Sequence, residues 1–99
     1  MARFAVYGNP GGAGYLLDIQ ADLLSHLNTR VVVPLLPLDI APMPAGTLNP
    51  VFEMEGGSVA MVTQFMAAVP AQMLKSPVLS LENRRNEITA AVDLLFQGF

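Results

Sequence analysis

Two glutamates of the sequence have the spacing of an acid–base pair. Glu53 and Glu55 lie two positions apart, and residues of the same parity project from the same face of an extended strand. Two neighbouring carboxylates can share a proton and serve as acid and base. Same-parity glutamates are also ordinary on the solvated face of a strand, and we interpret this pair as a surface feature.

The single histidine indicates neither a metal site nor a catalytic pair. His26 has no second histidine and no cysteine beside it, and the nearest carboxylates in sequence, Asp18, Asp22 and Asp39, lack ligand spacing. Adjacent side chains of an extended segment point to opposite faces, so Ser25 and His26 do not form a nucleophile–base pair. We expect this polar-flanked segment to be a surface turn.

A glycine-rich segment resembles a phosphate-binding loop in composition only. Residues 8–14 include four glycines, but no Lys-Ser/Thr follows them. The next segment alternates as a strand, so no helix N-terminus is offered to an anion. We expect a flexible turn here. Without a nucleophile, a base or a metal cluster, the sequence predicts a binding protein that is not an enzyme and needs no cofactor and no metal.

The composition indicates a single domain, residues 1–99, with more apolar residues than its own core can cover. Apolar residues make up 53% of the chain and charged residues 13%, against about a quarter charged in an average domain. A domain this short buries only roughly 60 to 65% of its unfolded surface. The longest apolar runs, residues 31–38 and 65–71, contain prolines and fall far below the roughly 18 residues of a membrane span. We therefore expect a protein partner, including a second copy of the chain, and no membrane.

Charge and targeting signals point to a cytoplasmic protein that does not bind nucleic acid by itself. The net charge is −3, which repels a polyanion. Arg84 and Arg85 form the only local basic spot, and we expect them in the solvated first turn of a helix. The N-terminus lacks an apolar stretch of signal-peptide length, and the chain has no cysteine.

Hydrophobic periodicity predicts five or so short strands. Alternation around Phe4 and Val6, and again over residues 15–20, indicates two strands on either side of the glycine-rich turn. A β-branched run over residues 30–35 predicts a third strand that ends or bulges at Pro34. Residues 48–55 and 59–63 predict a hairpin with glycine at its turn. For residues 65–74 the sequence is compatible with two predictions, a further strand of the sheet or a short crossing segment.

The C-terminal segment has helical periodicity. One face carries Leu81, Ile88, Val92, Leu95 and Phe99. Ser80 or Asn83 can cap the start, and Gly98 is placed to end the helix in the left-handed conformation.

Two apolar segments remain that one thin core cannot cover. Leu23 and Leu24 are adjacent, so in an extended segment they face opposite ways. At the C-terminus, Leu94, Leu95, Phe96 and Phe99 cover too wide an arc of the helix to face one core. We expect parts of both segments to contact another chain.

In order, these segments resemble the CcdB family of toxins from toxin–antitoxin modules. The resemblance covers nearly the whole chain and rests on the ordered set of segments, because no single motif is specific. Residues 17–24 resemble the family's valine-aspartate-valine-glutamine-serine-aspartate segment with its two following isoleucines. The other matching segments are residues 4–7, 30–35, 66–70, 86–88 and 95–99.

The resemblance implies a fold, partners and site residues. The fold would be mostly β with a C-terminal α-helix, either an SH3-like barrel or a twisted antiparallel sheet, in a two-fold homodimer without enzymatic activity. Family members bind the DNA gyrase A subunit, stabilise its cleaved-DNA complex, and are neutralised by the disordered C-terminal segment of a cognate antitoxin; roles in plasmid maintenance and in regulating transcription with the antitoxin would follow. Carried over by position, the gyrase-binding residues are Leu23, Leu24, Asp93, Phe96, Gln97, Gly98 and Phe99. The antitoxin-binding residues are Gly8, Asn9, Pro10, Gly11, Gly12, Asp39, Ile40, Pro42 and Met43.

One departure from the family pattern separates two functions. Toxic members end in tryptophan-glycine-isoleucine, whereas this chain ends in Gln97, Gly98 and Phe99. The basic residues usual in the family's first loop are also absent from residues 8–14. A gyrase-binding toxin is therefore weighed against a non-poisoning relative that binds antitoxin or another target. A small hydrolase or nuclease on the same scaffold is a third possibility, and it lacks a catalytic cluster.

Overall fold

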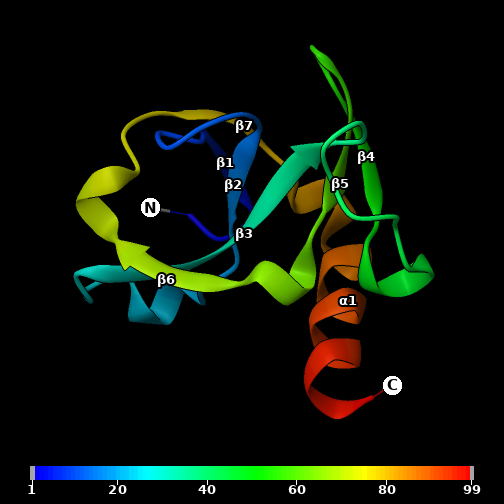
Figure 1. Cartoon of the computed structure of the whole chain (residues 1–99). Helices are drawn as coiled ribbons and strands as arrows, with labels where there is room; N and C mark the ends of the chain where they lie inside the picture. The colour runs from blue at the N-terminus through cyan, green and yellow to red at the C-terminus, as the bar shows by residue number, and fades with distance from the viewer. Residues whose placement is uncertain (1, 99) are drawn as a thin grey trace.

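A computed structural model describes residues 2–98 as an antiparallel sheet with a C-terminal helix (Figure 1). The strands are β1 (Ala5–Gly8), β2 (Tyr15–Asp18), β3 (Thr29–Pro37), β4 (Val51–Met54), β5 (Gly57–Met61), β6 (Ala67–Pro70) and β7 (Pro77–Ser80), and the helix is α1 (Arg85–Gln97). Short 3-10 turns connect them: η1 (Asp22–Leu24), η2 (Gly46–Leu48), η3 (Thr63–Phe65), η4 (Ala71–Met73) and η5 (Glu82–Arg84). The predicted fold class, mostly β with a C-terminal helix, is confirmed.

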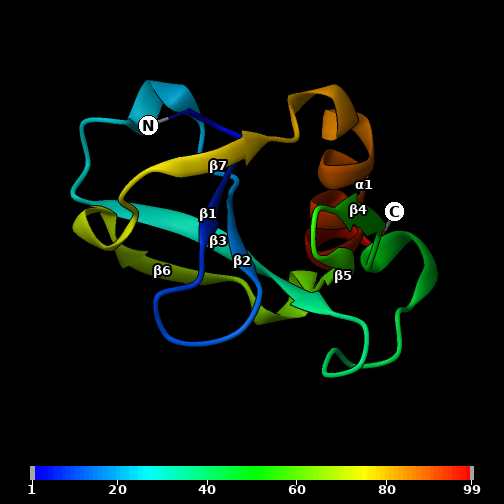
Figure 2. The ribbon, with the colours of Figure 1, turned by 90° about the horizontal axis from the view of Figure 1, so that it is seen from above.

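The strands form one sheet in the order β4-β5-β3-β2-β1-β7, with β6 pairing separately with β3. All strand pairs are antiparallel. The sheet curls into a half-barrel, and α1 stands beside the β4-β5 hairpin (Figures 1 and 2). Among residues 2–98, none of the helices is both long and apolar enough to cross a membrane.

The central strand β3 continues through Pro34 to Pro37, so of the two expectations for this residue, an end or a bulge of the strand, the end is wrong. One edge of β3 pairs with β2, whereas the other pairs first with β6 over residues 29–32 and then with β5 over residues 35–37. Pro34 lies where β3 changes partner, so its missing N–H removes no bond from either ladder. Its carbonyl still accepts a hydrogen bond from the Val62 amide at 3.0 Å.

The β4-β5 hairpin is confirmed, and one strand was missed. Met54 pairs with Gly57 across the turn, and Gly57 has a φ of 123° that favours glycine. The segment 65–74, left open by its sequence, contains β6. Strand β7, which pairs with β1, was not predicted because its four residues are all exposed and show no alternation of apolar and polar types.

The helix ends as expected and begins differently. Gly98 has a φ of 80°, and its amide donates to the Leu94 carbonyl at 3.0 Å, which confirms the left-handed end. The helix starts at Arg85, and the residue before it makes no side-chain cap hydrogen bond. Asn83 as helix cap was therefore wrong. Ser80 does not cap the helix either: its hydroxyl accepts a hydrogen bond from the Glu82 amide at 3.2 Å, at the start of η5, where Leu81 holds the cap position.

The central strands of the sheet, β1 and β2 among them, bury side chains on both faces. Alternate residues of β1 enter different clusters: Val6 packs with Leu17, Phe52 and Ile88 on the side covered by α1, while Tyr7 packs with Leu16, Val32 and Leu74 on the other side. This follows from the period of two in a strand.

Candidate protein-interaction site

The glutamates and the histidine do not assemble a catalytic centre in the described part of the chain. Glu53 accepts a hydrogen bond from the Ser58 hydroxyl at 2.5 Å, and Glu55 is exposed at the hairpin turn. Both side chains lie on the surface, in agreement with their interpretation as a solvated pair. His26 is exposed beyond η1, and the Ser25 hydroxyl donates to the Asp22 carbonyl. Among residues 2–98, no three His, Asp or Glu side chains are grouped to hold a metal ion.

The glycine-rich loop is organised by one asparagine. The Asn9 side-chain oxygen accepts from the Gly11 amide at 2.9 Å, its side-chain nitrogen donates to the Ala13 carbonyl at 3.3 Å, and its backbone amide donates to the Gly14 carbonyl at 3.2 Å. Asparagine commonly closes turns in this way. The expected mobility of this loop stays a prediction.

Gly14 fixes where the glycine-rich loop joins the sheet. Its φ is 84°, and a Cβ at this position would lie 2.3 Å from the Leu35 carbonyl oxygen of β3. Only glycine allows this close approach. The loop is thereby held against the end of β3.

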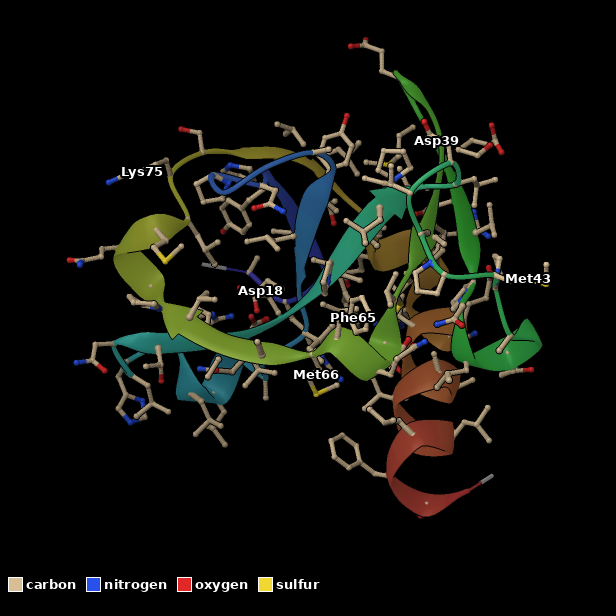
Figure 3. All side chains as sticks on the ribbon, in the orientation of Figure 1. Asp18, Asp39, Met43, Phe65, Met66 and Lys75 are labelled. Atoms are coloured by element: carbon tan, nitrogen blue, oxygen red, sulfur yellow. The ribbon has the colours of Figure 1, made fainter. Side chains whose placement is uncertain are left out.

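The two segments assigned to the antitoxin lie at one end of the sheet. The loop containing Gly8, Asn9, Pro10, Gly11 and Gly12 enters β2, and the connection containing Asp39, Ile40, Pro42 and Met43 leaves the adjacent end of β3. Both lie on the same side of the molecule in Figure 2. Figure 3 shows Met43 pointing outward, and this side chain is 90% exposed.

The structure brings together two of the residues assigned to gyrase from opposite ends of the chain. Leu24 of η1 and Phe96 of α1 line one groove of about 480 Å³. Leu23 is 87% exposed and Phe96 is 68% exposed. The other lining residues are Ile19, Gln20, Ala21, Leu27, Thr29, Val31, Met66 and Val92.

The remaining residues of that set are arranged around the helix end. Asp93 is half-buried, while Gln97 and Gly98 are exposed. Phe99 lies outside the described residues. The expected apolar surplus at η1 and at the end of α1 is therefore confirmed as exposed surface for Leu23 and Phe96.

Eight of the ten lining residues were not assigned to the site from the sequence, and Leu27 and Met66 illustrate why. Leu27 was placed in a polar surface turn, yet it lines the groove and is 41% exposed. Met66 follows η3 and points to the side where η1 and the end of α1 lie (Figure 3). The hydrophobicity of Leu27 was a usable signal, but the position of Met66 depends on the pairing of β6 with β3.

A buried ion pair lies next to η1. Arg30 approaches the same carboxylate oxygen of Asp18 with Nη2 at 2.7 Å and with Nε at 2.9 Å, and both side chains are fully buried. Burial raises the pKa of Asp18, and the hydrogen bond from Arg30 opposes this shift. Burial and the nearby Asp18 charge also raise the pKa of Tyr7.

The basic pair at the start of α1 is neutralised locally. Arg84 donates two hydrogen bonds to Glu87 at 2.5 and 2.9 Å, and its guanidinium lies 4.8 Å from the centre of the Phe52 ring. Arg85 pairs with Glu82 at 3.6 Å. These arginines were expected as solvated residues of the first helical turn; only Arg85 is in the helix, and Arg84 packs on the core before it.

Comparison with protein families decides the assignment. A sequence model of the CcdB protein family matches residues 3–98. The chain belongs to the CcdB family. Membership confirms the resemblance seen in the sequence, and it identifies the chain with a family of toxins that pair with antitoxins, not with an established enzyme family.

The family resemblance implies a tryptophan at position 97, where this CcdB family member has an exposed glutamine. Gln97 stands on the last turn of α1, between Phe96 and Gly98. A tryptophan here would present a large aromatic surface to a partner. Glutamine presents an amide whose donors and acceptors must be paired on burial.

Proposed function

We propose that this chain is the toxin of a type II toxin–antitoxin module, which acts in the cytoplasm by binding the DNA gyrase A subunit and stabilising the cleaved-DNA complex. The match to the CcdB family over residues 3–98 carries this proposal. The groove between Leu24 and Phe96 supports it, because its residues come from both segments that the family resemblance assigns to gyrase.

The mechanism is occupancy of a surface without chemistry on a substrate. Exposed leucine and phenylalanine side chains gain free energy when a partner removes them from water, at roughly 25 cal/mol per Å² of apolar area. A toxin that binds the cleaved state of gyrase more tightly than the resealed state shifts the equilibrium toward the break.

The active form is a homodimer. Apolar residues make up 53% of the chain, and large apolar side chains outside the Leu24–Phe96 groove, such as Phe65 and Val78, are also exposed, so a second copy can cover apolar surface that gyrase does not use. Light scattering at micromolar concentration should give twice the 10.6 kDa chain mass. A monomer under native conditions would remove this part of the proposal.

The neutralising antitoxin segment binds outside the Leu24–Phe96 groove, at the loop of residues 8–14 and the connection of residues 39–45. Ile40 and Met43 offer exposed apolar side chains there. Loop residues positioned by a rigid sheet are common binding elements. Because neither of these segments contributes a residue to the groove of Leu24 and Phe96, variants in them should lose antitoxin binding and keep their effect on gyrase.

A second candidate function is a non-poisoning CcdB family protein that binds antitoxin or another target. The observation that favours it is Gln97 in place of the family tryptophan.

Induced expression with growth and DNA-cleavage readouts separates the two functions. Growth arrest with accumulated cleaved DNA, relieved by Leu24→Asp and unaffected by Lys75→Asp on a distant exposed loop, supports the toxin. Unimpaired growth at high expression supports the second function.

A further inference from the structure

The η1 turn carries two of the assigned gyrase contacts but has no apolar anchor of its own. Residues 21–29 are all exposed, and η1 contains no buried residue. A 3-10 turn of three residues is not stable by itself. Something other than core packing must therefore hold Leu23 and Leu24 in place.

One tether comes from a buried glutamine. The Gln20 side-chain nitrogen donates to the Leu24 carbonyl at 3.1 Å, and its side-chain oxygen accepts from the Val31 amide of β3 at 3.0 Å. The Gln20 backbone amide also donates to the Asp18 carboxylate at 3.0 Å. That carboxylate is itself held by its ion pair with Arg30. Gln20 is thus fixed by the sheet at two points and reaches out to the turn at a third.

A second tether holds the other end of the turn. The Asp22 carboxylate accepts a hydrogen bond from the Arg3 amide at 2.7 Å. The donor is itself fixed, because the next residue, Phe4, is bonded on both sides: its amide donates to the Asp18 carbonyl at 2.6 Å, and its carbonyl accepts from the Leu81 amide at 2.9 Å.

We propose that Gln20 and Asp22 are positioning residues that hold Leu23 and Leu24 in their binding geometry before a partner arrives. In this role they act through the hydrogen bonds that hold the turn. Gln20 also lines the groove, so the test includes the order of the turn in the free chain, which a direct contact with a partner would not change. The expected effect on affinity for the gyrase A subunit rests on the proposed function, whereas the order of the turn can be measured in the free chain. If loss of a tether leaves the turn in its binding geometry a tenth of the time, apparent affinity falls about tenfold.

The first arm of the test measures the turn without any partner. Gln20→Met keeps the side-chain size and removes the amide that makes both side-chain hydrogen bonds. In ¹⁵N relaxation, the order parameters of residues 22–27 should fall from about 0.85 toward 0.6 in this variant. Val59→Ala, a core change in β5 chosen to lower thermal stability comparably, should leave them unchanged. Equal order in Gln20→Met and the native chain would overturn the proposal.

The second tether allows a rescue experiment. Asp22→Ala removes the acceptor for the Arg3 amide, while Asp22→Asn retains a side-chain oxygen at the same place. The alanine variant should lose order in the turn and the asparagine variant should regain it. Equal loss in both variants would show that this hydrogen bond does not position the turn.

The second arm measures binding to the purified dimerisation domain of the gyrase A subunit. Gln20→Met should weaken binding about tenfold, comparable to the loss of one hydrogen bond, and Val59→Ala should not. Unchanged binding by Gln20→Met would overturn the functional half of the proposal. No binding by the native chain would refute gyrase as the target, and the relaxation arm would still decide the positioning role.

Discussion

Replacing Gln97 by tryptophan should strengthen binding to the gyrase A dimerisation domain. Gln97 is exposed on the last turn of α1, next to Phe96, which is 68% exposed, so a tryptophan fits there without repacking the core. Burying 150 to 250 Å² of indole at roughly 25 cal/mol per Å² gives about 4 to 6 kcal/mol before ordering costs. A net gain of about 2 kcal/mol, typical of an interface hot spot, corresponds to roughly thirtyfold in affinity.

The assay is calorimetric titration of that domain with the native chain, with Gln97→Trp, and with Gln72→Trp as a control. Gln72 is an exposed glutamine of η4, outside the groove. We expect weak binding by the native chain, about thirtyfold tighter binding by Gln97→Trp, and no gain from the control. Submicromolar binding by the native chain, or no gain at position 97, would refute this reasoning about the tail.

Three further changes test the fold and its charges. Gly14→Ala should lower the free energy of unfolding by more than about 1 to 2 kcal/mol, the usual cost of a left-handed alanine, because its Cβ also meets a carbonyl oxygen of β3. A smaller loss, measured by urea denaturation, would contradict the close approach of residue 14 to β3. Arg30→Leu should lower the free energy of unfolding by about 3 to 5 kcal/mol, because it leaves a buried Asp18 charge unpaired, and adding Asp18→Leu should recover most of that loss. If the losses of the two single variants simply add in the double variant, the two residues do not stabilise the fold as a pair. Arg84 lowers the pKa of Glu87, so the stability that Glu87 adds is present above its ordinary pKa and disappears as pH falls through the lowered value. The difference in free energy of unfolding between the native chain and Glu87→Gln, below about 1 kcal/mol for so exposed a pair, should therefore shrink as the pH falls below the ordinary pKa of Glu87.

Local signals in the sequence predicted the elements that depend on local chemistry. The helical spacing of Ile88 and Val92, the left-handed end at Gly98 and the glycine hairpin near Gly57 are each set by a few neighbouring residues. Strand β7, whose four residues are all exposed, has no apolar pattern, and its pairing with β1 depends on long-range contacts. The sequence predicts an end or a bulge at Pro34, but it cannot show that β3 changes partner there, because that change is a property of the whole sheet.

The candidate site was predictable only in part for the same reason. The exposed apolar character of Leu23 and Phe96 follows from their types and spacing, and their assignment to one surface came from the family resemblance. The tether from Gln20 to Leu24 could not be seen in sequence, because the conformation that brings the two groups to 3.1 Å is fixed by the neighbouring strand β3.

The most direct test of gyrase as the target is a DNA-cleavage assay with purified gyrase and supercoiled plasmid. We expect linear DNA to accumulate weakly with the native chain and strongly with Gln97→Trp, and to disappear when Leu24→Asp is added to the latter. Absence of linear DNA with both the native chain and Gln97→Trp, at concentrations where each is folded and dimeric, would contradict the proposed function.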